Sequence, residues 1–235
     1  MPSIDSLPVF KSEGLVYDLY PDRLIANLDD DRVLAAIGSF AINGRELMDQ
    51  FSPTDQLFGG AMSRVYRLGS ICCKYSSDFT PKNKFLKPED LSLQFQFLDH
   101  LQTVVNSYEL TVPDQIAVFK NKDGEYLKLE SYIPDHLTLS KFRNKLNPED
   151  KSAFLYEIAR RVKSLRNTSP FLAIGLNDLI DDNAQYPNPS NILVPDTPDL
   201  DFYGQPFVIL DQPSSEIHLN RLRALRSYLK LNRKA

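Results

Sequence analysis

The fold is decided by the stretch Asn188-Pro189-Ser190-Asn191-Ile192-Leu193-Val194, followed after a polar loop by Phe207-Val208-Ile209-Leu210-Asp211. In the first part a polar turn ends at Asn191 and an apolar strand follows, and in the second an apolar strand ends at Asp211. Two such strands can bring one amide and one carboxylate to a common point. Amide and carboxylate oxygens are ligands that Mg²⁺ takes in proteins, so the pattern predicts a site for magnesium and phosphate.

The composition indicates a globular protein of one domain or two small lobes, with 235 residues of which 42% are hydrophobic. The formal net charge of -4 argues against a general nucleic-acid-binding protein, which usually carries a basic surface. The first residues lack the basic and apolar regions of a secretory signal, and no apolar run approaches the length of a membrane span. We therefore expect an intracellular protein, cytoplasmic or nuclear, without a nucleic-acid partner or a membrane span.

The two cysteines, Cys72 and Cys73, are neighbours in an apolar, strand-like run, where a disulfide between them would be strained. We expect both to be reduced core residues, which suits the cytosol or the nucleus. The three histidines are scattered and lack the spacing of metal ligands.

Hydrophobic periodicity and turn residues predict a series of short strands and helices. They comprise a helix over 32–40, a Gly-Gly turn over 58–63, a hairpin over 65–75, a helix over 88–105, strands at 115–119 and 125–129, a connector at 131–135, a long helix from 148 and a basic amphipathic helix over 219–235. Asn147 suits the N-cap of the long helix, and basic residues near its end, Arg161 among them, suit the helix dipole.

The order of these elements resembles that of the protein kinase fold and the kinase-like phosphotransferases over residues 56–215. The catalytic loop is most similar to the pattern N-D-L-N-P-x-N-I of fungal kinase-like proteins, but it is split. Asn177-Asp178-Leu179 supplies the first half and 188–192 the second, with residues 180–187 inserted between them. The resemblance implies an α+β, two-lobed protein-kinase-like fold with a small antiparallel-sheet N-lobe and a truncated helical C-lobe. It divides the chain into an N-terminal extension (1–52) and a kinase-like domain (53–235), whose N-lobe is 53–133 and whose minimal C-lobe is 134–235.

The resemblance also implies that ATP and Mg²⁺ bind, and it assigns roles to individual residues. Asp178 corresponds to the catalytic base or orienting group, and Asn191 and Asp211 correspond to the magnesium ligands. The residues that correspond to ATP-binding positions are Gly59 and Gly60 at the phosphates, Lys74 at the α- and β-phosphates, and Leu129, Glu130 and Tyr132, whose backbone lies where the adenine is bound.

Several departures from the family pattern concern activity. The glycine loop is incomplete, Gln94 occupies the helix position that usually carries a glutamate, and Leu176 replaces a histidine. The insertion separates Asp178 from Asn191, and only 24 residues follow Asp211. We therefore expect a degenerate kinase-like protein, either a nucleotide-binding pseudokinase or a weak ATP-dependent phosphotransferase, which also has a protein partner or a protein substrate. The alternatives are an active minimal protein kinase that phosphorylates Ser/Thr or a small-molecule hydroxyl, and a non-catalytic α+β interaction module.

Overall fold

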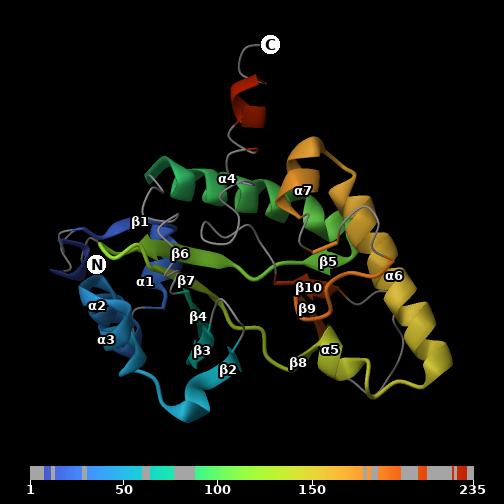
Figure 1. The fold of residues 1–235 in the computed structure, drawn as a ribbon, viewed down its shortest axis with the longest axis horizontal. Coiled ribbons are helices and arrows are strands. Elements are labelled where there is room, and N and C mark those ends of the chain that lie inside the picture. The colour runs from blue at the N-terminus through green and yellow to red at the C-terminus, as the bar shows by residue number, and fades with distance from the viewer. Residues whose placement is uncertain are drawn as a thin grey trace. The chain divides into compact units, whose positions relative to one another are not determined.

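The structure of the protein is a computed structural model, which describes residues 8–11, 14–27, 31–59, 64–76, 88–176, 179–180, 185–196, 206–210, 224 and 227–231 (Figure 1). The chain forms two compact units. Unit 1 contains Met1–Ser92, Asp114–Tyr132 and Ser215–Leu219, and unit 2 contains Leu93–Pro113, Ile133–Ser214 and Asn220–Ala235. The fold is mixed α+β, as the sequence predicts.

Unit 1 is built on a six-stranded sheet with the strand order β1-β6-β7-β4-β3-β2, in which all neighbouring strands are antiparallel (Figure 1). The strands are β1 (Val16–Leu19), β2 (Gln56–Gly59), β3 (Arg64–Leu68), β4 (Ile71–Ser76), β6 (Gln115–Lys120) and β7 (Tyr126–Ser131). The predicted hairpin over 65–75 is confirmed as β3 and β4. Its turn contains Gly69 at a φ of 57°, a left-handed conformation that glycine adopts without the steric cost of a Cβ.

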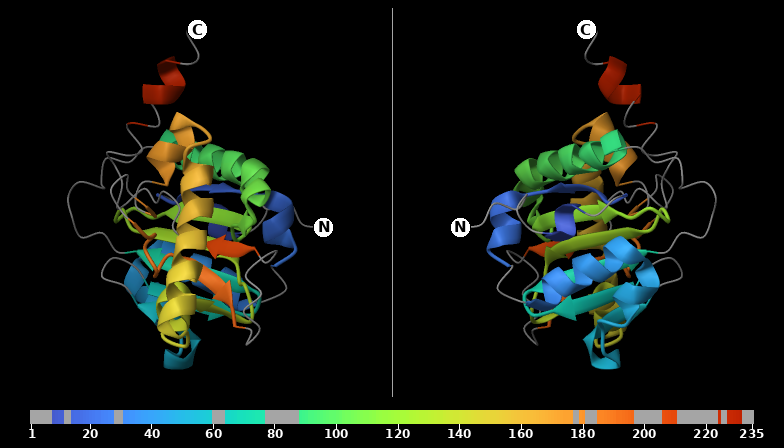
Figure 2. Two further views of the ribbon diagram at one scale, coloured as in Figure 1. Left: turned by 90° about the vertical axis from the view of Figure 1, so that its right-hand side faces the viewer. Right: turned by 90° about the vertical axis from the view of Figure 1, so that its left-hand side faces the viewer.

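The two faces of this sheet differ because side chains alternate along each strand. One face carries the apolar side chains of the unit 1 core, among them Cys73, Phe119 and Leu129, and it packs against Ile37 and Phe40 of α2 (Figure 2). The other face carries Cys72, Lys74, Lys128 and Glu130. The prediction for the cysteines is confirmed, since both are buried and free.

The first 51 residues contribute to the sheet and the core of unit 1. Strand β1 pairs with β6, Val16 lying opposite Lys120, and α2 buries one apolar side against the sheet. The helix predicted over 32–40 is confirmed as α2. The helical segments are η2 (Pro8–Lys11), α1 (Pro21–Ile25), α2 (Asp31–Ile42), α3 (Gly44–Met48) and η3 (Pro53–Asp55).

Two expected loops are partly strand. Strand β2 reaches Gly59, which lies opposite Arg64, so residues 58 and 59 of the turn expected over 58–63 are strand, and residues 60–63 lie outside the described residues. Strand β7 reaches Ser131, which lies opposite Ile71, so the connector begins after that residue. In both cases pairing with a neighbouring strand extends a segment whose local sequence is typical of a turn.

Unit 2 contains a four-stranded sheet with the order β5-β10-β9-β8, in which β5 and β10 are parallel and the other neighbours are antiparallel. Its strands are β5 (Leu110–Thr111), β8 (His136–Thr138), β9 (Ile192–Pro195) and β10 (Phe207–Ile209). Its helical segments are most of α4 (Pro88–Val104), η5 (Val105–Tyr108), α5 (Leu139–Phe142), α6 (Pro148–Arg166) and α7 (Pro170–Gly175).

Helix α6 is the longest element of unit 2 and runs beside β9 and β10 (Figures 1 and 2). It begins where the sequence predicts, because the Asn147 side chain accepts a hydrogen bond from the N–H of Asp150 at 2.9 Å and Pro148 is its first residue. Its buried side carries Phe154, whose ring makes an edge-to-face contact with Phe207 of β10. This contact fixes α6 against the strand that leads to Asp211.

Of the basic helix predicted over 219–235, the structure describes residue 224 and residues 227–231, which are helical. Within the described part of the chain, no helix is both long and apolar enough to cross a membrane.

Candidate functional site

Lys74 lies on β4 in the middle of the unit 1 sheet, where it is half-buried. Its cross-strand neighbours are Val65 on β3 and Lys128 on β7. Alternation places it on the face opposite the apolar core, to which Cys73 and Tyr75 point. The rigid centre of a sheet therefore presents this ammonium group.

Glu130 is a buried carboxylate on the same face as Lys74. Its Oε2 lies 2.8 Å from the Nζ of Lys128, both side chains being 8% exposed, and it also accepts a hydrogen bond from Gln115 at 3.3 Å. Burial alone would raise the pKa of Glu130, but Lys128, Lys74 and the Gln115 bond outweigh it, so the pKa lies below its usual value. Glu130 is therefore an ionised, fully enclosed side chain, whereas the sequence suggested a role only for its backbone.

The positions expected beside an adenine differ in what they can offer. Leu129 is buried in the apolar core, and its backbone lies in a central strand between Cys73 and Ala117. The N–H of Tyr132 donates to the carbonyl of Ser70 at 2.8 Å and is therefore already used.

The glycines expected at the phosphates are only partly described. Gly59 is the last residue of β2, and Gly60 lies outside the described residues.

Asn191 lies at the end of a hydrogen-bonded turn in unit 2. Its N–H donates to the carbonyl of Asn188 at 3.1 Å, and its own carbonyl accepts from the N–H of Leu210 at 2.8 Å. Because both backbone groups are used within the chain, the side-chain amide is the group left to meet a ligand. Leu210 directly precedes Asp211, which itself lies outside the described residues, as does Asp178. The hairpin of β9 and β10 thus places Asn191 opposite the residue before the predicted carboxylate.

The two halves of the split loop meet at the base of the insertion. The N–H of Asn188 donates to the carbonyl of Leu179 at 2.8 Å. In the unsplit pattern these two residues would be consecutive, and in the structure one hydrogen bond still joins them. The side chains of Leu176, Leu179 and Ile180 are buried, which stabilises the described residues on either side of 177–178.

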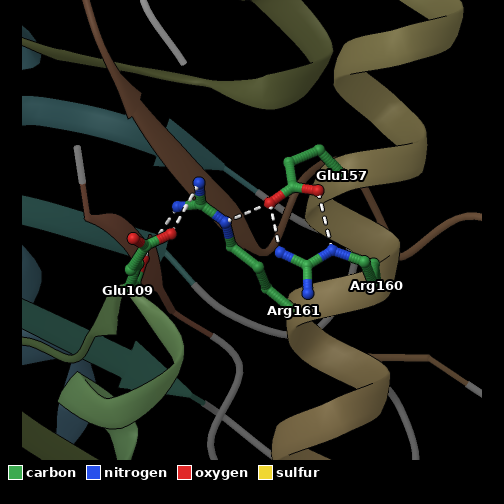
Figure 3. Close-up of polar contacts among 4 residues, drawn as sticks. All are labelled: Glu109, Glu157, Arg160 and Arg161. Atoms are coloured by element: carbon green, nitrogen blue, oxygen red, sulfur yellow. Dashed lines mark hydrogen bonds and ion pairs between the residues drawn. The ribbon is translucent and has the colours of Figure 1, made fainter. Parts of the chain in front are cut away.

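Sequence reasoning missed the most deeply buried charge of unit 2, Arg161 on α6, which is 2% exposed (Figure 3). Its guanidinium contacts Glu157 through Nε at 2.8 Å and the Glu109 carboxylate through Nη2 at 2.9 Å. Nη1 donates to the Glu109 carbonyl at 3.2 Å, and the group lies 4.8 Å from the ring centroid of Phe207. The sequence pattern places this arginine among the basic residues near the end of the helix but does not indicate that it is buried. Only its spacing of four residues from Glu157 could have indicated an ion pair.

The Glu109 carbonyl connects Arg161 to β10. Glu109 has a left-handed backbone at a φ of 54°, and its carbonyl accepts from both Arg161 and the N–H of Phe207, the latter at 3.2 Å. Phe207 begins the strand that ends beside Asn191 and Asp211. One buried arginine therefore links α6, the segment after α4 and the strand of the predicted metal ligand.

Glu157 has a strongly lowered pKa. The hydrogen bond from Arg160 is the largest cause, and despite the opposing effect of burial the contacts with Arg160 and Arg161 lower the pKa of Glu157 to about 2. The carboxylate stays ionised throughout the physiological pH range and keeps the guanidinium of Arg161 compensated (Figure 3).

For a metal, the described residues contain no group of three or more His, Cys, Asp or Glu side chains. The predicted magnesium ligands are of a different kind, one amide and one carboxylate, and these hard oxygen donors fit Mg²⁺.

The elements follow one another in the order that the sequence analysis expects of a protein-kinase-like fold. This order is the hairpin bearing Lys74, helix α4, two further strands of the same antiparallel sheet, and then α6, β9 and β10. Comparison with solved structures matches the chain to APH(2″)-IIa in its ternary complex with streptomycin and ATP. The two share 14% sequence identity, with a TM-score of 0.29. The match covers 55% of this chain and 42% of that chain, so it spans less than half of APH(2″)-IIa. No family model and no curated protein matches the sequence.

Proposed function

We propose that the protein binds ATP together with Mg²⁺ and is a degenerate, weakly active kinase-like phosphotransferase. The observation that supports this proposal best is the hydrogen bond between the N–H of Asn188 and the carbonyl of Leu179. This bond joins the last residue of the first half of the pattern to the first residue of the second half, so Leu179 lies next to the turn that ends at Asn191. The described ends of the two halves therefore remain adjacent despite the insertion.

Each residue of the proposed site has a role that follows from its chemistry. The ammonium of Lys74 neutralises charge on the α- and β-phosphates, and the rigid sheet gives it a defined position. The Asn191 amide and the Asp211 carboxylate hold Mg²⁺, which neutralises phosphate charge when bound. The Asp178 carboxylate orients the acceptor hydroxyl and takes its proton.

Reduced activity follows from the positions that differ from the family. Gln94 is uncharged where the family pattern has a glutamate, and the incomplete glycine loop has fewer glycines that allow a close backbone approach to phosphate. Phosphoryl transfer depends mainly on positioning, and a misplacement of about 1 Å can lower the rate about a hundredfold. The acceptor is a protein or small-molecule hydroxyl.

Two measurements on the full chain test this proposal. Isothermal titration calorimetry with ATP, with and without Mg²⁺, compares wild type with Lys74→Met, Asn191→Ala and Asp211→Asn, and the exposed Lys122→Met is the matched control. We expect magnesium-dependent binding by wild type and by the control, and binding about tenfold weaker or more in the other three, since each loses one charge-assisted or metal contact.

Transfer of labelled phosphate from ATP then separates the remaining alternatives. A slow transfer that Asp178→Asn and Asp211→Asn abolish supports the weak phosphotransferase. Binding without transfer identifies a pseudokinase, and the absence of ATP binding refutes the proposal. The combined Lys74→Met, Asn191→Ala variant shows whether both residues act on one nucleotide, because independent contacts give additive losses and coupled contacts do not.

A further inference from the structure

The polar face of the unit 1 sheet carries an unusual set of buried charges. Lys74 on β4 lies directly opposite Lys128 on β7, and Glu130 lies two residues further along β7, on the same face and opposite Cys72. Gln115 of β6 lies on the other side of Glu130 and donates a hydrogen bond to it. Lysine and glutamate are almost never fully buried unless they are paired, so this face needs an electrostatic explanation.

The electrostatic problem on this face is the pair of lysines. Side chains directly opposite each other in an antiparallel sheet have Cβ atoms about 4.5–5.5 Å apart, and like charges in such positions repel. Lys128 is 8% exposed, so water screens its charge poorly. The carboxylate that offsets this repulsion is Glu130, 2.8 Å from the Nζ of Lys128.

Glu130 is also within electrostatic reach of Lys74. The positive charge of Lys74 is one of the causes that lower the pKa of Glu130, together with Lys128 and Gln115. The thiol of Cys72 experiences the same carboxylate, because burial first and the charge of Glu130 second raise the pKa of Cys72 to about 12. Glu130 therefore interacts electrostatically with Lys128, Lys74 and Cys72, while Arg67 of β3, opposite Cys72 on this face, adds a further positive charge near the thiol.

We propose that Glu130 is the positioning residue of Lys74: it neutralises Lys128 and so holds the Lys74 ammonium in place for an anionic ligand. The counter-charge comes from the adjacent strand of the same sheet, whose register fixes the distance. This inference rests on the proposed function, in which Lys74 binds the phosphates of ATP. In this proposal the Glu130 side chain acts through Lys128 and Lys74, apart from the adenine contact expected of its backbone.

A purely structural Lys128–Glu130 pair makes different predictions. In that case Glu130→Gln lowers stability but leaves the properties of Lys74 unchanged. A third possibility is that Glu130 only lowers the net positive charge of a sheet face that binds anions. In that case Glu130→Gln makes the face more positive and ATP binds more tightly. The direction of the change in affinity therefore separates positioning from simple charge subtraction.

The first experiment measures the titration of Lys74 by NMR after reductive ¹³C-methylation of the full chain, with the Lys74 signal assigned from Lys74→Arg. In Glu130→Gln the uncompensated charge of Lys128 disfavours a second ammonium nearby, and we expect the midpoint of Lys74 to fall by about one pH unit. The double variant Lys128→Met, Glu130→Gln removes both charges and should return the midpoint toward its wild-type position. Lys122, exposed in a turn, is the internal control. An unchanged Lys74 midpoint in Glu130→Gln overturns the inference.

The second experiment measures ATP affinity in the presence of Mg²⁺. We expect Glu130→Gln to bind about tenfold more weakly, the loss expected when one charge-assisted contact is no longer held in place. The double variant with Met at 128 should recover most of the affinity, and Glu130→Gln should add little to Lys74→Met. Tighter binding by Glu130→Gln, or full additivity with Lys74→Met, overturns the inference.

The two proposals fail in distinguishable ways. If wild type binds no ATP, the proposed function is refuted, while the NMR titration still decides whether Glu130 controls Lys74. If Glu130→Gln does not fold, the double variant without either buried charge replaces it, because paired removal leaves no isolated charge. In the double variant the Lys74 midpoint should then match wild type, and a large downward shift there contradicts the proposal.

Discussion

Replacement of Arg161 by methionine should destabilise the protein strongly, and adjacent Arg160 offers a matched control. Both arginines lie on α6 and both contact Glu157, but Arg161 is 2% exposed and Arg160 is 55% exposed. Arg161→Met keeps an unbranched side chain of similar length and removes only the charged end. The variant therefore measures the polar contacts of the guanidinium more than its packing.

The magnitude follows from what remains after the change. Glu157 keeps Arg160, and the Glu109 carboxylate is 53% exposed, so neither becomes an isolated buried charge. The hydrogen bonds to Glu157 and the Glu109 carbonyl are lost, as is the contact with the Phe207 ring. Hydrogen bonds to charged groups contribute about 1.5–3 kcal/mol each, and because the variant no longer has to desolvate a guanidinium we expect a net loss of about 3 kcal/mol.

Thermal unfolding followed by circular dichroism, together with urea titration, measures this effect. For a chain of this length, about 3 kcal/mol corresponds to a fall in Tm of about 6–12 °C, whereas Arg160→Met should change Tm little because exposed pairs contribute little. A Tm of Arg161→Met close to that of wild type would refute the reasoning. It would show that the desolvation of the guanidinium cancels its contacts.

Three further predictions concern pH, thiol chemistry and packing. The pKa of Glu157 is lowered to about 2, with the hydrogen bond from Arg160 as its largest cause, so this carboxylate contributes stability above the ordinary glutamate pKa of 4.5 that is lost as the pH falls toward 2. Glu157→Gln should flatten the loss of Tm over this range, and an unchanged pH profile contradicts the assignment. The pKa of Cys72 is raised to about 12 by burial and by Glu130. At pH 8 a thiol reagent should therefore label Cys72 only as fast as the chain unfolds locally and exposes the thiol. Rapid labelling of the folded chain contradicts this. A Cβ at Gly175 would overlap the buried ring of Phe97, so Gly175→Ala should lower stability by about 1–3 kcal/mol despite its better helix propensity. Phe97→Leu should remove part of that penalty when the two changes are combined, and strict additivity of the two losses argues against the overlap.

Much of the local structure was predictable because its signals lie within a few residues of one another. The start of α6 follows from an asparagine cap and a proline, which act on backbone groups of the same turn. The hairpin of β3 and β4 follows from alternation and a two-residue Gly-Ser turn. The structure describes only part of the predicted site, since Asp178, Asp211 and Gly60 lie outside the described residues.

Long-range pairing was not predictable by the same reasoning. Strand β1 joins β6 across about a hundred residues of sequence, and nothing near Val16 specifies that partner. The alternation around Lys128 and Glu130 does indicate a polar face, but it cannot show that this face is enclosed and that its charges are paired. The contact between Leu179 and Asn188 likewise depends on the path of the inserted loop.

The sequence by itself determined the order of the elements, the split polar turn and the residue types suited to a magnesium-bound nucleotide, because these depend on local propensity and side-chain chemistry. Only the tertiary structure decided which charges are buried together. Lys128 and Glu130 form a buried ion pair on the sheet face that carries Lys74. Arg161 forms ion pairs with Glu109 and Glu157 and a cation–π contact with Phe207. The physical reason is that the energy of a charge depends on its distance from other charges and from water, and both are set by contacts between segments far apart in the chain.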